Sequence, residues 1–132
     1  MSSLTNAMEA HVVNHFLRNT AVTSPSAVYL ALYSTDPGED DSGIEASYTG
    51  YARQEVTFTA IDSTGKTQNS VPVIFADNED QVSANVRFVG VVTEEIVGNG
   101  ELLLHAPLGV EKELDTGEGL TFKTGGCAFT LD

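Results

Sequence analysis

Two histidines, His11 and His15, stand four residues apart in the N-terminal part of the sequence. On a helix, this spacing places two imidazoles on one face, where they could share a metal ion. The zinc-protease pattern needs a glutamate directly after the first histidine, but Val12 occupies that position. The histidines are therefore more typical of an ordinary helix surface, and we expect no metal site.

A second group of side chains could bind a hard cation. It is an acidic stretch that contains Asp36, Glu39, Asp40, Asp41 and Glu45. Carboxylates of this kind bind calcium, but the alternate spacing of an EF-hand loop is not present. The stretch follows an Asp-Pro-Gly turn, so we expect a solvated acidic loop.

Two further arrangements could support catalysis. Cys127 needs a paired base, and His105 is the only histidine on an expected strand. Glu94 and Glu95 are neighbouring carboxylates, but consecutive residues of a strand point to opposite faces, so they make a poor glycosidase pair. The sequence also lacks a nucleophile elbow, a phosphate-binding loop and a dinucleotide fingerprint. We expect no enzymatic activity, no catalytic residue and no cofactor.

Arg53 lies in the strand-like stretch GYARQEVTF and is one of only three arginines in a chain of net charge −13. It shares a predicted strand face with Tyr51 and Glu55, without a histidine or a second basic residue nearby. Pairing with a carboxylate of the acidic loop, a neighbouring strand or a partner subunit is therefore favoured over catalysis. The candidate structural or interface residues are Arg53, Tyr51, Glu55, Tyr29, Tyr33 and Pro72.

These side chains must be positioned by one helix and several strands. Leu4, Met8, Val12 and Phe16 recur every four residues and predict an amphipathic helix over about residues 4–18. Asn6 with Glu9 resembles a capping box at its start, and Arg18-Asn19 is typical of its end.

Alternation of apolar residues predicts the strands that follow. Residues 27–34 are apolar on both faces and indicate a central strand, and residues 51–60 alternate clearly. Pro72 places its own strand at a sheet edge. Further short strands are expected at residues 71–76, 85–93, 101–106, 119–123 and 127–131. This pattern predicts one mainly β domain over residues 1–132, a jelly-roll-like antiparallel β-sandwich with one N-terminal α-helix.

Composition narrows the function further. A net charge of −13 repels phosphates and anionic lipids, so we expect neither direct nucleic-acid binding nor membrane binding. The single cysteine excludes an intramolecular disulfide. No signal peptide or membrane-spanning run is evident, so we expect synthesis in the cytoplasm.

The order of several sequence segments resembles that of a known protein family. VYLALYSTDPGEDDSG, GYARQEVTF, VRFVGVVTEE, GELLLHAPL, LDTGEGLTF and CAFTLD, in this order after a leading helix, resemble a family of small tailed-bacteriophage virion proteins. Members of that family are described as tail-fibre-like proteins or as capsid decoration (cement) proteins with a jelly-roll fold. The resemblance extends from Leu4 to Asp132.

The resemblance implies a non-enzymatic structural role. Our first hypothesis is a capsid decoration protein on the capsid exterior of the virion, made in the host bacterial cytoplasm, with the major capsid protein and itself, as a homodimer or homotrimer, as partners. The alternative is a tail, baseplate or tail-fibre-associated protein with tail or baseplate partners. A third hypothesis, from a different class, is a glycan-binding or hydrolytic β-sandwich.

Overall fold

A five-stranded antiparallel sheet forms the centre of the structure, a computed structural model that describes residues 3–131. Met1, Ser2 and Asp132, at the limits of the predicted domain, lie outside the described residues. In spatial order the strands are β1 (Ser3–Leu4), β7 (Leu102–Leu114), β6 (Ala84–Val92), β2 (Val28–Tyr33) and β3 (Gln54–Val56). Strand β2 pairs with β6 on one side and β3 on the other, so it is central, as predicted.

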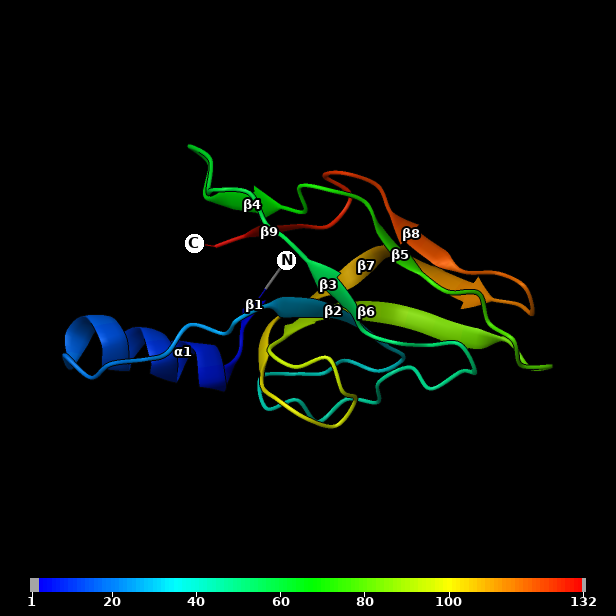
Figure 1. Cartoon of the computed structure of the whole chain (residues 1–132), viewed down its shortest axis with the longest axis horizontal. Helices are drawn as coiled ribbons and strands as arrows, with labels where there is room; N and C mark the ends of the chain where they lie inside the picture. The colour runs from blue at the N-terminus through cyan, green and yellow to red at the C-terminus, as the bar shows by residue number, and fades with distance from the viewer. Residues whose placement is uncertain (1–2, 132) are drawn as a thin grey trace.

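Two small antiparallel sheets cover one face of the central sheet (Figure 1). One pairs β4 (Lys66–Gln68) with β9 (Ala128–Thr130), and the other pairs β5 (Val73–Phe75) with β8 (Leu120–Phe122). The main hydrophobic core fills the space between these layers. It contains buried side chains from β2, β3 and β5 to β9, among them Leu30, Phe75, Val89, Leu104 and Phe129.

The opposite face of the central sheet carries a smaller apolar cluster. Ala31, Tyr33, Val92 and Leu102 are buried there. The loop between β2 and β3 and the loop between β6 and β7 run along this face in Figure 1. Both faces of β2 are therefore covered, which explains why its residues are apolar on both sides.

The N-terminal helix differs in three ways from the expected one. It is α-helical only over α1 (Asn6–Val12) and continues as the π-helix η1 (Val13–Leu17). The N-cap is Thr5 rather than Asn6, because the Thr5 hydroxyl accepts the bond from the Met8 amide. Leu4 belongs to β1, where it pairs with Leu104. The predicted end is confirmed, since Asn19 adopts a left-handed conformation with φ 54°.

Three predicted strands have other limits. Of residues 51–60, only β3 is a strand, and Phe58 makes an isolated bridge with Asn69. Strand β7 is longer than expected and continues to Leu114 past Pro107, with a register shift opposite Val86 and Phe88. Pro72 lies just before β5, which pairs on one side only, with β8, in the part of the chain that the structure describes. Strands β1 and β4 were not predicted.

The mainly β class, with antiparallel sheets and one N-terminal helix, is confirmed. The jelly-roll connectivity and the single-domain organisation stay predictions. Within residues 3–131, no helix is both long enough and apolar enough to cross a membrane.

Candidate interaction site

Arg53 is the centre of a buried polar cluster, although its side chain comes from the segment just before β3. Its residue exposure is 4%. Nε donates to Glu45 Oε2 at 2.9 Å and one terminal nitrogen donates to Glu45 Oε1 at 2.7 Å, which is a two-pronged ion pair. The other terminal nitrogen donates to the carbonyls of Glu94, Ile96 and Asn99 at 2.9–3.0 Å. One guanidinium thus fastens two loops together.

The carboxylate of Glu45 receives a third hydrogen bond. Tyr51 donates its hydroxyl to Glu45 Oε2 at 2.6 Å and accepts the backbone N–H of Leu32 at 3.1 Å. Glu45 itself forms a bridge with Tyr33 at the end of β2. Tyr51 and Glu45 therefore continue the edge of β2 beyond the point where β3 stops pairing. We call Arg53, Glu45 and Tyr51 the Arg53 cluster.

The protonation states in the Arg53 cluster follow from its burial and its hydrogen bonds. The hydrogen bonds with Glu45 raise the pKa of Arg53 above its usual value, so this side chain stays a cation. Burial, followed by the Glu45 carboxylate, raises the pKa of Tyr51 far above the usual range, so its hydroxyl stays a donor. Because both pKa values are raised, neither Arg53 nor Tyr51 exchanges protons near neutral pH, as a general acid or base must.

Tyr33 makes a second contact between the central sheet and the acidic loop. Its hydroxyl donates to Asp41 Oδ1 at 3.1 Å. Burial is the main cause that raises the pKa of the Asp41 carboxyl. The expectation of a solvated acidic loop is therefore wrong for Glu45, whose side chain is 12% exposed, and incomplete for Asp41. Tyr51 and Arg53, just before β3, hold Glu45 inward, and Tyr33 at the end of β2 binds Asp41.

The other interface candidates lie apart from this cluster. Tyr29 pairs with Glu55 across β2 and β3, and Glu55 is exposed to solvent. Burial, and then the carboxylates of Glu95, Glu55 and Glu94, raise the pKa of Tyr29. Pro72 is exposed before β5. The structure thus brings Tyr51 and Arg53 together with Tyr33 nearby, and their role in an interface stays a prediction.

The residues considered for chemistry do not form a catalytic arrangement. His11 Nε2 lies 3.0 Å from Glu101 Oε1, and the His15 ring packs edge-on against Phe16. Cys127 is buried in the main core, and burial raises the pKa of its thiol to about 12. Among residues 3–131, no three histidine, cysteine, aspartate or glutamate side chains are grouped to hold a metal ion.

Two glutamates lie where the sequence did not place them. Glu94 and Glu95 were expected on a strand, but β6 ends at Val92 and both residues belong to the following loop. Arg53 accounts for the shape of this loop, because one of its terminal nitrogens donates to the carbonyls of Glu94, Ile96 and Asn99. The alternation argument against a carboxylate pair therefore does not apply to them.

Two buried asparagines were not found from the sequence. Asn69 donates from Nδ2 to the carbonyls of Val71 and Lys123, and its Oδ1 accepts the amide of Cys127. Asn78 donates to the carbonyls of Val82 and Leu114. Both side chains are fully buried. Each lies next to a turn, where asparagine is a common residue, so the sequence does not distinguish these two from other turn asparagines. Only their burial in the folded structure does.

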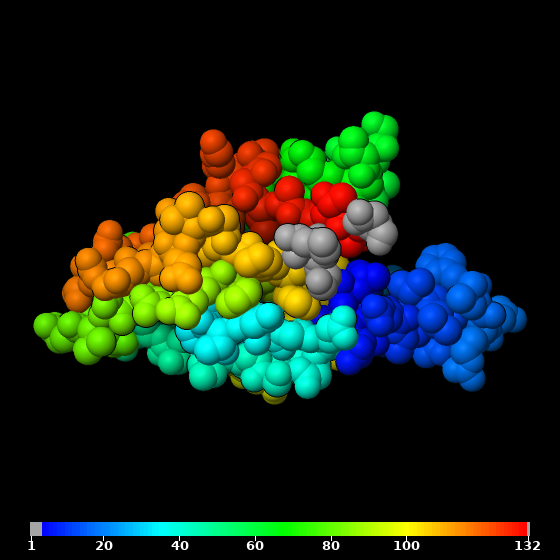
Figure 2. Space-filling view, turned by 180° about the vertical axis from the view of Figure 1, so that it is seen from behind, coloured from blue at the N-terminus to red at the C-terminus, as the bar shows by residue number. Residues whose placement is uncertain are grey.

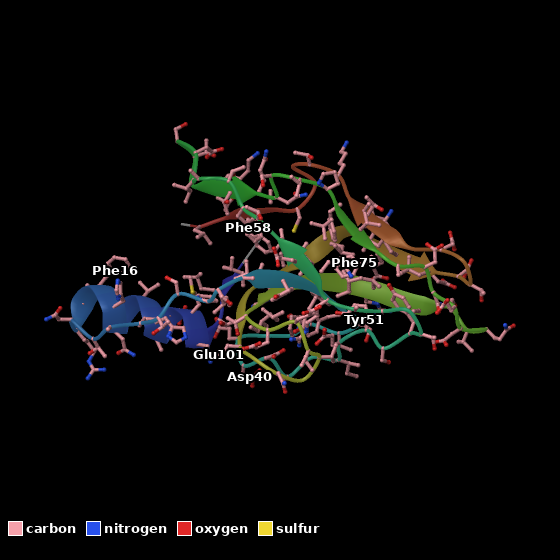
Figure 3. All side chains as sticks on the ribbon, in the orientation of Figure 1. Phe16, Asp40, Tyr51, Phe58, Phe75 and Glu101 are labelled. Carbon is pink, nitrogen blue, oxygen red and sulfur yellow. The ribbon has the colours of Figure 1, made fainter. Side chains whose placement is uncertain are left out.

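The helical segment forms a prominent surface feature. Helices α1 and η1 project from one end of the body, and Figure 2 shows this projection from behind. Phe16 lies on its outer part in Figure 3, far from the aromatic rings of Phe58 and Phe75 between the sheets. We call residues 5–26, which comprise both helices and the returning segment, the arm. A groove of about 850 Å³ lies between the helical part of the arm, its returning segment and the loop after β6, with Met8, Val12, Phe16, Val22 and Glu94 in its lining.

No curated protein matches the chain. The family model described as podophage GP4 fiber I protein gp80 matches residues 3–130, which is nearly the whole chain. The resemblance to tailed-phage virion proteins is thereby confirmed. The chain belongs to the podophage GP4 fiber I protein gp80 family and is a structural protein of a tailed-phage virion.

Proposed function

We propose that this protein is a non-enzymatic subunit of the tail-fibre apparatus, held on the virion exterior by contacts with other virion proteins and with copies of itself. The observation that carries the proposal is the family match over residues 3–130, whose description names a fibre protein. Binding only to the assembled state would stabilise that state by mass action.

The use of the polar side chains supports a structural role. Arg53 donates five hydrogen bonds to acceptors within the chain, two of them to the carboxylate of Glu45. A group with this many fixed bonds orients backbone, and it leaves no unused cation for a substrate. The net charge of −13 supports a place away from packaged DNA.

A second candidate is capsid decoration, in which the protein binds the major capsid protein on the outside of the shell. The resemblance in the sequence supports this role, and the acidic charge suits it equally. The two candidates differ in copy number. A fibre component is present in tens of copies or fewer at the tail, whereas a decoration protein is present in hundreds over the shell.

Electron cryomicroscopy of purified particles, with and without this protein, tests the proposal. We expect density that is lost from the tail region of the particles lacking the protein. Loss of density over the whole shell would support decoration instead. Unchanged particles, or hydrolysis of a host glycan by the purified protein, would contradict the proposal of a structural role.

A further inference from the structure

The arm has an unusual surface for a folded protein. Neither α1 nor η1 contains a buried residue, and Phe16 and Leu17 are 75% and 77% exposed. Helices of about this length are marginal in water by themselves, and most helical stability in proteins comes from packing of an apolar face. The predicted apolar stripe is present in the arm, but nothing in the described chain covers its outer end.

The arm is anchored at its root and not at its tip. Buried Thr5 donates its N–H to the Leu103 carbonyl at 3.0 Å and its hydroxyl to the Leu102 carbonyl at 2.5 Å. At the tip, the side-chain hydrogen bonds are local, from Arg18 to Asn14 at 2.8 Å and from the Thr20 hydroxyl to the Arg18 carbonyl at 3.4 Å. The last turn is a π-helix, closed by the hydrogen bond from the Arg18 amide to the Val13 carbonyl. Such turns are rare in proteins overall, and those that occur are often at functional sites.

The groove beside the arm offers a matching surface. Apolar side chains line it from both the helix and the returning segment, including Met8, Val12, Val22, Pro25 and Phe16 itself, which stays 75% exposed at the outer end. Glu94 and Glu101 line its inner side. A binding partner with two large apolar side chains next to a cation could contact the apolar lining and the acidic residues of the groove at the same time.

The arm itself has this chemistry, because Phe16 and Leu17 are followed directly by Arg18. We infer that the arm joins copies of this chain, with Phe16 and Leu17 of one copy lying in the groove of a second copy and Arg18 facing the second copy's acidic side of the groove. This inference rests on the proposed function, in which copies of the protein bind one another. Each copy provides both a tip and a groove, so two copies related by a two-fold axis exchange tips reciprocally and leave neither surface unused.

The distribution of charge favours the arm over any other surface for this contact. The first 26 residues contain one acidic and one basic residue, Glu9 and Arg18, so the whole net charge of −13 belongs to residues 27–132. Two such bodies repel each other over the distance of the Debye length, about 8–10 Å. A contact through the projecting arms, whose net charge is zero, holds the acidic bodies apart while it buries the apolar tips.

Light scattering coupled to size-exclusion chromatography tests the inference on the purified full-length protein. We expect the parent to have twice the 14.0 kDa mass of one chain. The double variant Phe16→Ser/Leu17→Ser should have the mass of a single chain. Its dissociation constant should rise at least about a hundredfold, because the substitutions remove four large apolar side chains, two from each copy, from the interface. Arg18→Glu should weaken association more at low salt than at high salt.

The matched control is Val82→Ser/Val110→Ser, which removes two apolar side chains of similar exposure, 74% and 70%, from the body. This control should associate like the parent. Circular dichroism confirms that each variant folds. A parent protein that is monomeric at high concentration, or arm variants that associate like the parent, would overturn the inference. Those results leave the proposed place in the virion untouched, because that place is decided by the particle images.

Discussion

Arg53 makes five hydrogen bonds from a side chain with little access to water. Replacing it with alanine would leave the Glu45 carboxylate partly buried with only Tyr51 as a partner, and would free three carbonyls of the loop after β6. Breaking a buried pair on one side costs about 3–5 kcal/mol. We therefore expect Arg53→Ala to lose about 3 kcal/mol or more of unfolding free energy, measured by urea denaturation.

A surface ion pair in the same protein provides the control. Arg87 lies 3.5 Å from Glu111 with both side chains about half exposed or more, and exposed pairs contribute about 1 kcal/mol or less. Arg87→Ala should therefore be nearly neutral. Arg53→Lys retains the charge but cannot reproduce the planar set of donors, so its loss should be intermediate. Equal stability of Arg53→Ala and Arg87→Ala would contradict the structural role of the Arg53 cluster.

The sequence predicted that Arg53 pairs with a carboxylate, in the acidic loop, on a neighbouring strand or in a partner subunit, but not which of these or how far the bonding extends. The scarcity of cations pointed to a carboxylate partner, and that partner is Glu45. The three carbonyls could not be foreseen, because a backbone acceptor has no signature in the sequence. Glu45 was predicted to lie in a solvated loop because its own segment does not show its donors. These are the side chains of Tyr51 and Arg53, six and eight residues later in the chain.

At the scale of elements, buried Asn69 connects β4 to the turn that joins β8 and β9. Its side chain binds three backbone groups, and its own backbone binds Cys127 and Gly125. Asn69→Ala removes all three side-chain bonds and leaves buried backbone groups unpaired, at about 1–3 kcal/mol each before relaxation. We expect a loss of at least about 2 kcal/mol in unfolding free energy.

Hydrogen exchange locates this effect within the fold. Amides of β9 and of residues 123–127 should exchange faster in Asn69→Ala, while those of β2 and β6 should be less affected. Asn85→Ala, on the exposed side of β6, is the control and should change stability by less than about 0.5 kcal/mol. Uniformly faster exchange across all strands would contradict a local role for Asn69.

The elements also show what periodicity can and cannot predict. Strands β2 and β6 were predicted to within about two residues, because burial on one or both faces shapes their composition. The segment around β3 alternates over ten residues, yet three of them pair, since the chain turns to bring Tyr51 and Arg53 to Glu45. The helix was predicted from a stripe whose outer residues the chain does not bury, so the pattern identified a helix without identifying what packs on it.

For the whole molecule, the dominant quantity is the net charge of −13 on 132 residues. Mutual repulsion among the carboxylates opposes the compact state, and salt screens exposed charges more than buried ones. The Arg53–Glu45 pair is buried and should be weakened little. We therefore expect the melting temperature, measured by circular dichroism, to rise by several degrees from low salt to about 0.5 M sodium chloride.

A variant with fewer exposed carboxylates tests the cause of this rise. Glu39→Gln/Asp40→Asn/Glu111→Gln removes three exposed negative charges. It should melt higher than the parent at low salt and respond less to added salt. A melting temperature that falls as sodium chloride is added would contradict charge repulsion as the main long-range term.

The burial of Cys127 has a practical consequence for anyone who works with assembled particles. The only thiol is enclosed between the sheets, 4% exposed, and burial keeps it protonated. Copies of the protein therefore cannot be linked by accidental oxidation while they stay folded, and a maleimide dye has no native target on their surface. A single cysteine introduced on the surface would carry a fluorophore at one known position, so that individual virions could be followed by light microscopy.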